Sequence, residues 1–102
     1  MSMEKKYHKT KPVCRTTFTI PPDQADGAAF AHLVGEMNGW DETATPMERH
    51  GDGSFSVSLD LEVGREYQFR YLLDGRRWEN DWEADRYAPS PYGDSDNSVV
   101  VA

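Results

Sequence analysis

Hydrophobic and polar residues alternate along two neighbouring runs of the chain, Ser54 to Leu61 and Glu66 to Leu73. A period of two is typical of a β-strand with one buried face, because successive side chains of a strand point to opposite sides. The pattern therefore predicts two strands that share a core. The residues expected to point inward are Phe55, Val57, Leu59, Tyr67, Phe69 and Tyr71. Arg70 lies on the opposite face, and we expect it to be exposed on the sheet.

Shorter segments between the turns are predicted to form the remaining strands. They cover Arg15 to Ile20, Ala28 to Gly35, Arg76 to Asn80 and Ser98 to Val101. Turn signals separate the runs, at Asp52-Gly53, Val63-Gly64 and Asp74-Gly75. No segment has a sustained helical stripe. Roughly six to seven short strands between turns predict an all-β fold, an antiparallel β-sandwich of immunoglobulin-like type.

Trp40 follows a tight turn at the end of a predicted strand. The Asn38-Gly39 pair favours backbone conformations with positive φ, so we expect the chain to reverse there and to leave Trp40 at the rim of the sheet. An indole at such a rim can stack on a sugar ring. The alternative from the turn alone is that Trp40 folds back as a lid over the core, since tryptophan is usually largely buried.

Length and charge limit the possible functions. The chain has 102 residues, which predicts one domain, over residues 15–102. Its net charge of −7 argues against a nucleic-acid partner, which would require a basic patch. Residues 1–15 contain five basic residues and one acidic residue, and we expect residues 1–14 to form a disordered basic arm. No apolar stretch resembles a signal peptide or a membrane span, so the sequence predicts a cytoplasmic protein without a membrane partner.

Acidic residues and histidines are present but form no recognisable catalytic or metal-binding motif. Four acids alternate along an apparent loop or edge strand, namely Glu79, Asp81, Glu83 and Asp85. Without apolar surroundings to raise a pKa, we interpret them as a solvated acidic face. The histidines lack metal-ligand spacing, and the single Cys14 cannot form an intramolecular disulfide. Asp94 to Asn97 superficially resembles a calcium loop but lacks the glycine and glutamate that an EF-hand needs. We therefore expect no catalytic residue, no metal and no cofactor.

Several short motifs occur in a specific order over about two-thirds of the chain. They are Val34 to Trp40, Thr45-Pro46-Met47, Asp52 to Phe55, Leu61 to Gly64, Tyr67 to Tyr71, Asp74-Gly75 and Asn97 to Val101. In this order, the run from Leu33 to Ala102 resembles carbohydrate-binding module family 48. This is the early-set domain at the N-terminus of isoamylase and of glycogen branching and debranching enzymes, and in the β-subunit of AMP-activated protein kinase. Two departures are Met37, where the family usually has phenylalanine, and a longer, more acidic segment from Arg76 to Tyr87.

The resemblance implies an early-set sandwich that binds α-glucans, such as glycogen or maltooligosaccharides, without catalysis. It places the site on Trp40 and Trp78 as stacking surfaces, with Arg70 and Asn97 as polar contacts. The chemistry of these side chains is consistent with that site. The apolar faces of a sugar can stack on the two indoles, and its hydroxyls can form hydrogen bonds with the cation and the amide. Two alternatives stay open, that Arg70 pairs with an acid and that Asn97 only fixes a turn. The longer segment also leaves open whether Trp78 or Trp82 takes the second position.

The resemblance also implies a protein partner, either a glucan-active enzyme or a kinase. The alternative function is a protein-interaction module that docks such a partner without binding sugar. In the enzymes of the family a catalytic barrel follows this domain. Because none follows the last predicted strand here, we expect no autonomous hydrolysis or branching.

Overall fold

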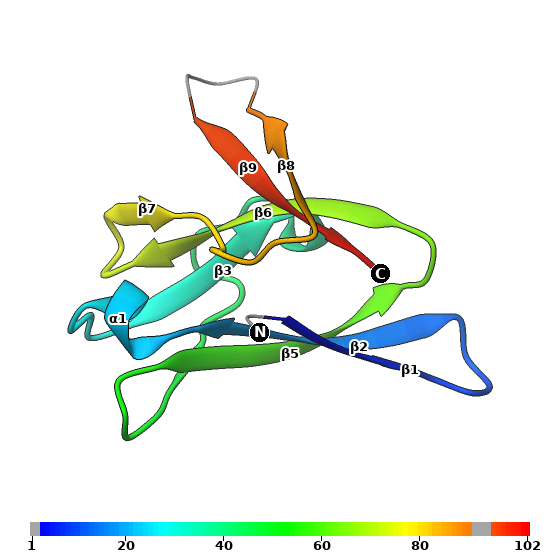
Figure 1. Cartoon of the computed structure of the whole chain (residues 1–102), viewed down its shortest axis with the longest axis horizontal. Coiled ribbons are helices and arrows are strands. Elements are labelled where there is room, and N and C mark those ends of the chain that lie inside the picture. The colour runs from blue at the N-terminus through cyan, green and yellow to red at the C-terminus, as the bar shows by residue number, and fades with distance from the viewer. Residues whose placement is uncertain (1–2, 91–94) are drawn as a thin grey trace.

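Two antiparallel sheets form a sandwich in the computed structural model, which describes residues 3–90 and 95–102 (Figure 1). These residues contain nine strands. Sheet A has the order β1-β2-β5-β4, formed by Met3–Tyr7, Val13–Ile20, Phe55–Glu62 and Glu48–Arg49. Sheet B has the order β3-β6-β9-β8, formed by Ala31–Gly35, Glu66–Leu73, Asp96–Val101 and Arg86–Pro89, and β7 (Arg77–Glu79) also pairs with β6. This architecture confirms the predicted all-β, antiparallel sandwich.

The core lies between the two sheets and contains the residues predicted to point inward. Four of them are buried: Phe55, Tyr67, Phe69 and Tyr71. Two are half-buried and pack against the same cluster: Val57 and Leu59. An aromatic contact joins the two sheets: Phe18 of β2 packs edge-on against Phe69 of β6, with ring centroids 5.1 Å apart. The faces of β5 and β6 are therefore assigned as the alternation predicts.

The N-terminal segment differs from the predicted disordered arm over residues 1–14. Its described part forms β1 and the start of β2, which pair from Met3 opposite Phe18 to Tyr7 opposite Cys14. Met3 is buried, and Glu4 and Lys6 lie on the outer face of sheet A because side chains alternate along the strand. The sandwich therefore includes this hairpin. The run of charges from Glu4 to Lys6 concealed the strand in the sequence.

The remaining additional elements are short. β4 and β8 have two and four residues, too few for an alternation to be recognised. Helical structure is limited to α1 (Pro22–Ala25) and a 3₁₀ turn, η1 (Glu36–Asn38). Within the described ranges, no helix has the length and hydropathy needed to cross a membrane.

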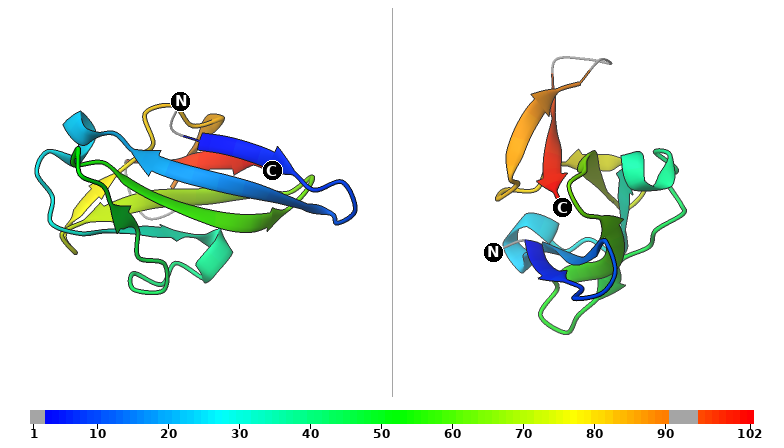
Figure 2. Two further views of the ribbon diagram at one scale, coloured as in Figure 1. Left: turned by 90° about the horizontal axis from the view of Figure 1, so that it is seen from below. Right: turned by 90° about the vertical axis from the view of Figure 1, so that its right-hand side faces the viewer.

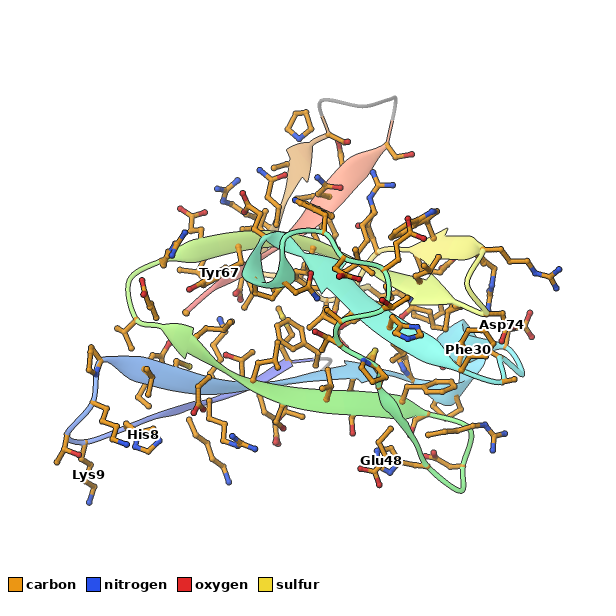
Figure 3. All side chains as sticks on the ribbon, turned by 180° about the vertical axis from the view of Figure 1, so that it is seen from behind. His8, Lys9, Phe30, Glu48, Tyr67 and Asp74 are labelled. Atoms are coloured by element: carbon orange, nitrogen blue, oxygen red, sulfur yellow. The ribbon has the colours of Figure 1, made fainter. Side chains whose placement is uncertain are left out.

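The predicted turn after β6 is held by Asp74. Its carboxylate accepts hydrogen bonds from the backbone N–H groups of Ala29 and Phe30, at 2.8 and 3.3 Å. Figure 3 shows Asp74 and Phe30 beside each other at this end of the sandwich. Asp74 and Gly75 have φ values of 55° and 69°, as expected for a tight hairpin turn. This turn starts the hairpin that carries Trp78.

β6 is the central strand of sheet B, and its two halves have different neighbours. Residues Glu66 to Phe69 pair with β9, whereas Tyr71 to Leu73 pair with β7. Arg70 lies between these two segments and pairs with Val34 of β3 on the other side. Figure 1 shows the β8–β9 hairpin extending away from the sandwich, beyond the part of β9 that pairs with β6. The sheet thus divides beside Arg70.

Candidate functional site

A groove with a volume of about 480 Å³ lies on the outer face of sheet B, where the sheet divides. Its lining residues are Val34, Glu36, Trp40, Glu42, Gln68, Arg70, Trp78, Ser90 and Asn97. Gln68 and Arg70 alternate with the core residues of β6, which is why they face outward. The structure therefore brings all four predicted site residues, Trp40, Arg70, Trp78 and Asn97, to one groove.

Trp40 is held at the rim of this groove by a hydrogen-bonded turn. Asn38 organises the turn, because its side chain accepts a hydrogen bond from the Gly35 N–H at 3.1 Å and donates to the Leu33 carbonyl at 2.8 Å. Gly39 and Trp40 then have φ values of 67° and 61°, and the Trp40 N–H donates to the Gly35 carbonyl at 2.8 Å. The indole is 40% exposed, so it does not act as a lid over the core.

Gly35 brings this turn into direct contact with β6. A Cβ atom at Gly35 would lie 2.5 Å from the Gln68 carbonyl oxygen and 2.7 Å from Phe69 Cβ, so only glycine fits there. A second contact comes from Glu36, whose carboxylate accepts the Gln68 N–H at 2.6 Å. The resemblance did not assign either residue to the site. Their role is to fix the position of Trp40 relative to β6.

Trp78 reaches the groove from β7, where it pairs with Leu72 of β6. Its side chain is 41% exposed. Trp82 is 56% exposed but does not line the groove. The structure therefore assigns the second indole of the groove to Trp78 and places Trp82 outside it.

Arg70 and Asn97 are joined by a hydrogen bond across the division of the sheet. Arg70 Nε donates to Asn97 Oδ1 at 2.7 Å, and Asn97 Nδ2 donates to Gln68 Oε1 at 2.9 Å. Among the described residues Arg70 forms no ion pair, so its alternative pairing with an acid is not found there. Asn97 is 4% exposed and belongs to β9, not to the preceding turn. It orients Arg70, whose terminal N–H groups remain available to a ligand.

Asp81 corrects the interpretation of the acidic segment as a solvated face. The residue is fully buried, and the Tyr71 hydroxyl donates to its carboxylate at 2.6 Å. The backbone N–H of Asp81 donates to Ser98 Oγ at 2.9 Å, and the Ser98 hydroxyl donates to Asn80 Oδ1 at 2.8 Å. Burial and the nearby Asp81 carboxylate raise the pKa of Tyr71 well above its usual value. This network anchors the segment after Trp78 to β6 and β9.

The described residues contain no group of three or more histidine, cysteine, aspartate or glutamate side chains that could hold a metal ion. The groove contains two exposed indoles, the guanidinium of Arg70, two carboxylates and two side-chain amides. These groups can bind an uncharged ligand that has both apolar faces and hydroxyl groups.

Comparison with known proteins points in the same direction. Residues 24–93 match the family described as Carbohydrate-binding module 48 (Isoamylase N-terminal domain). Trp40, Arg70 and Trp78 lie within the matched residues, and Asn97 lies beyond them. The chain is also similar to the 1,4-alpha-glucan branching enzyme GlgB of Butyrivibrio fibrisolvens, with 33% identity over 64 residues. This alignment covers 63% of the chain but only 10% of that enzyme.

Proposed function

The chain belongs to the carbohydrate-binding module 48 family, and on this basis we propose that its groove binds α-glucan chains without transforming them. The observation that carries the proposal is the convergence of Trp40 and Trp78 on one groove, with Arg70 between the segments that hold them. The similar branching enzyme is named for its action on 1,4-α-glucan, which suggests the same class of polymer here. Glycogen, starch-type glucan and maltooligosaccharides are the ligands that we expect.

The proposed binding mode follows from the chemistry of glucose units. Their C–H faces are apolar, and stacking these faces on the exposed indoles removes apolar surface from water, which favours binding. Their hydroxyls can accept hydrogen bonds from the terminal N–H groups of Arg70 and donate to Glu36 or Glu42 at the edge of the groove. Asn97 holds the guanidinium in place, so less side-chain freedom is lost when a ligand binds.

We expect weak binding to a single oligosaccharide, with a dissociation constant of roughly micromolar to millimolar. The ligand carries no charge, so no counterions are released and added salt should change the affinity little. A chelator should likewise leave the affinity unchanged, since no metal takes part in the proposed contacts.

The test is isothermal titration with maltoheptaose, with wild type and three tryptophan variants. Trp40→Ala and Trp78→Ala should each weaken binding at least about tenfold, because tryptophan side chains that contact a ligand commonly carry much of the binding energy. Trp82→Ala is the matched control, since Trp82 is exposed but lies outside the groove, and it should bind as wild type does. Circular dichroism establishes that each variant is folded.

The proposal fails if the wild-type protein gives no heat and does not co-sediment with glycogen at millimolar sugar. That result would favour the alternative, a module that docks a glucan-active enzyme or a kinase through protein contacts. Equal losses in all three variants would place the ligand outside the groove. A protein partner and a cytoplasmic location stay predictions from the sequence.

A further inference from the structure

Strand β1 forms an open edge of sheet A (Figure 2). Other edges of the described chain are short or covered. β4 and β7 have only two and three residues, and β8 ends in Pro89. The edge of β3 is covered, because backbone hydrogen bonds of Leu33 and Met47 join β3 to the segment that follows it. An open strand edge presents unpaired backbone N–H and C=O groups. A strand of another chain can form hydrogen bonds with these groups. β1, with five residues, is the longest edge without such a cover.

The β1–β2 ladder determines which backbone groups of β1 are free. The His8 N–H donates to the Val13 carbonyl at 3.1 Å, and the register continues from this pair along both strands. In an antiparallel ladder, every second residue directs both of its backbone groups toward the partner strand. Glu4 and Lys6 therefore bond to β2. The N–H and C=O groups of Met3, Lys5 and Tyr7 point to the open side.

We propose that β1 pairs antiparallel with β1 of a second copy of this chain, about a two-fold axis at Lys5. The Lys5 residues then face each other, and Met3 of each copy lies opposite Tyr7 of the other. In this register the outward groups of these three residues meet one another, so both strands complete their hydrogen bonding. The two copies of sheet A become one continuous sheet, with the two-fold symmetry that is commonest among dimers.

The charges of β1 favour this register over its neighbours. Glu4 of one copy lies opposite Lys6 of the other, twice, on the outer face of the joined sheet. These are positions without direct hydrogen bonds between them, where opposing side chains approach most closely. A two-fold axis at Glu4 would oppose two glutamates, and an axis at Lys6 would oppose two lysines. Like charges directly opposite each other are destabilising.

The inward side of β1 is compatible with the same pairing. Lysines on an edge often prevent pairing, but the Lys5 ammonium group is bound by the Asp85 carboxylate at 2.6 Å, which offsets the repulsion between the two Lys5 residues. A second groove, of about 520 Å³, is lined by the first four residues of β1, Met3 to Lys6, and by Glu83 and Asp85 of the segment before β8. The Tyr7 ring is 57% exposed in the single chain, and in this register Tyr7 lies opposite Met3 of the second copy, which is already buried in its own chain.

The test is sedimentation velocity on the whole chain, from about 10 µM to about 1 mM, because a contact of one short strand should be weak. The wild-type sedimentation coefficient should rise with concentration. Glu4→Lys places lysines opposite Lys6, and Lys6→Glu places glutamates opposite Glu4, so each single variant should associate at least about tenfold less tightly. Thermal melting establishes that these exposed substitutions leave the monomer folded.

Two further samples distinguish β1 pairing from a general effect of charge. The double variant Glu4→Lys/Lys6→Glu restores opposite charges across the axis and should associate as wild type does. An equimolar mixture of the two single variants should also associate, since lysines of one chain meet glutamates of the other. The proposal is overturned if the wild-type chain stays monomeric throughout, or if neither the double variant nor the mixture regains association. Glycogen binding does not enter this test, so its outcome is independent of the groove.

Discussion

Trp40 combines an exposed indole with a backbone in the left-handed region, at φ 61°. That region disfavours residues with a Cβ atom by about 1–2 kcal/mol, and for a bulky residue it is uncommon. Strain of this kind persists where the surroundings hold the backbone, here through the hydrogen bonds of Asn38 and of the Trp40 N–H. The strained residue is also the one at the rim of the groove.

A pair of substitutions at Trp40 separates backbone strain from ligand binding. Trp40→Gly should be more stable than Trp40→Ala by about 1 kcal/mol, because glycine adopts positive φ without a steric cost. Both variants lack the indole, so both should lose the affinity for maltoheptaose to the same extent. Urea unfolding measures the difference in stability. A Trp40→Gly protein no more stable than Trp40→Ala would show that the backbone at this position carries no strain.

The buried pair of Tyr71 and Asp81 predicts a dependence of stability on pH. The pKa of Tyr71 is raised in the folded protein, so folding favours its neutral form. This contribution is complete below the pKa of the unfolded chain, near 10.0, and is lost as the pH rises from there toward the pKa of the folded state. Tyr71→Phe should therefore lose stability less steeply than wild type above about pH 10.

At neutral pH, Tyr71→Phe should reduce the free energy of unfolding by about 1–3 kcal/mol, because the buried Asp81 carboxylate loses a donor. Tyr7→Phe removes a hydroxyl from an exposed side chain and serves as the control, with a change within about 0.5 kcal/mol. Parallel pH profiles for wild type and Tyr71→Phe would contradict the coupling. Urea titrations at several pH values supply both measurements.

At the level of secondary-structure elements, the division of β6 positions the groove. One half of β6 pairs with β9 and the other half pairs with β7. The 3₁₀ turn η1, which follows β3 in the chain, also contacts β6. Each element brings one part of the site: η1 precedes Trp40, β7 carries Trp78, and β9 carries Asn97. Small changes where η1 meets β6 should therefore move Trp40 relative to the other groups.

Gly35→Ala tests this contact. The added Cβ would overlap the Gln68 carbonyl oxygen and the Phe69 Cβ of β6, so the variant should lose about 2 kcal/mol or more of stability, together with most of its affinity for maltoheptaose. Gly51→Ala is the matched control, because a Cβ at Gly51 has no atom within 4 Å. It should change stability by no more than about 0.5 kcal/mol. Wild-type binding by Gly35→Ala would show that the position of η1 does not matter to the site.

The sequence predicted the elements whose side chains follow a simple period, and with them the faces of β5 and β6. β1 escaped prediction because three consecutive charges hide its alternation, although Met3 is buried. The choice of Trp78 over Trp82 depends on the register of the β6–β7 hairpin, which spacing alone did not fix. Asp81 was misplaced because its partners, Tyr71 and Ser98, are distant in sequence. The inward-facing Tyr71 hydroxyl was the available signal, since a buried hydroxyl needs a partner.

At the level of the whole molecule, the groove and the open edge of β1 lie on different sheets, the groove on sheet B and the edge on sheet A. The two proposals are therefore compatible, and together they describe a pair of chains with two grooves. On a branched or long glucan, the second groove would bind at a raised effective concentration once the first is occupied. Weak single sites would then give a much tighter association with the polymer than with a short oligosaccharide.

The distribution of the three tryptophans has a spectroscopic consequence. All three side chains are substantially exposed, and the core aromatics are phenylalanine and tyrosine. Indole emission therefore reports little on the packing between the sheets, unlike in most sandwiches with a buried tryptophan. Two of the three emitters line the groove, while Trp82 contributes a constant background from outside it. The intrinsic fluorescence of this protein is thus a signal of what occupies the groove, available without any label.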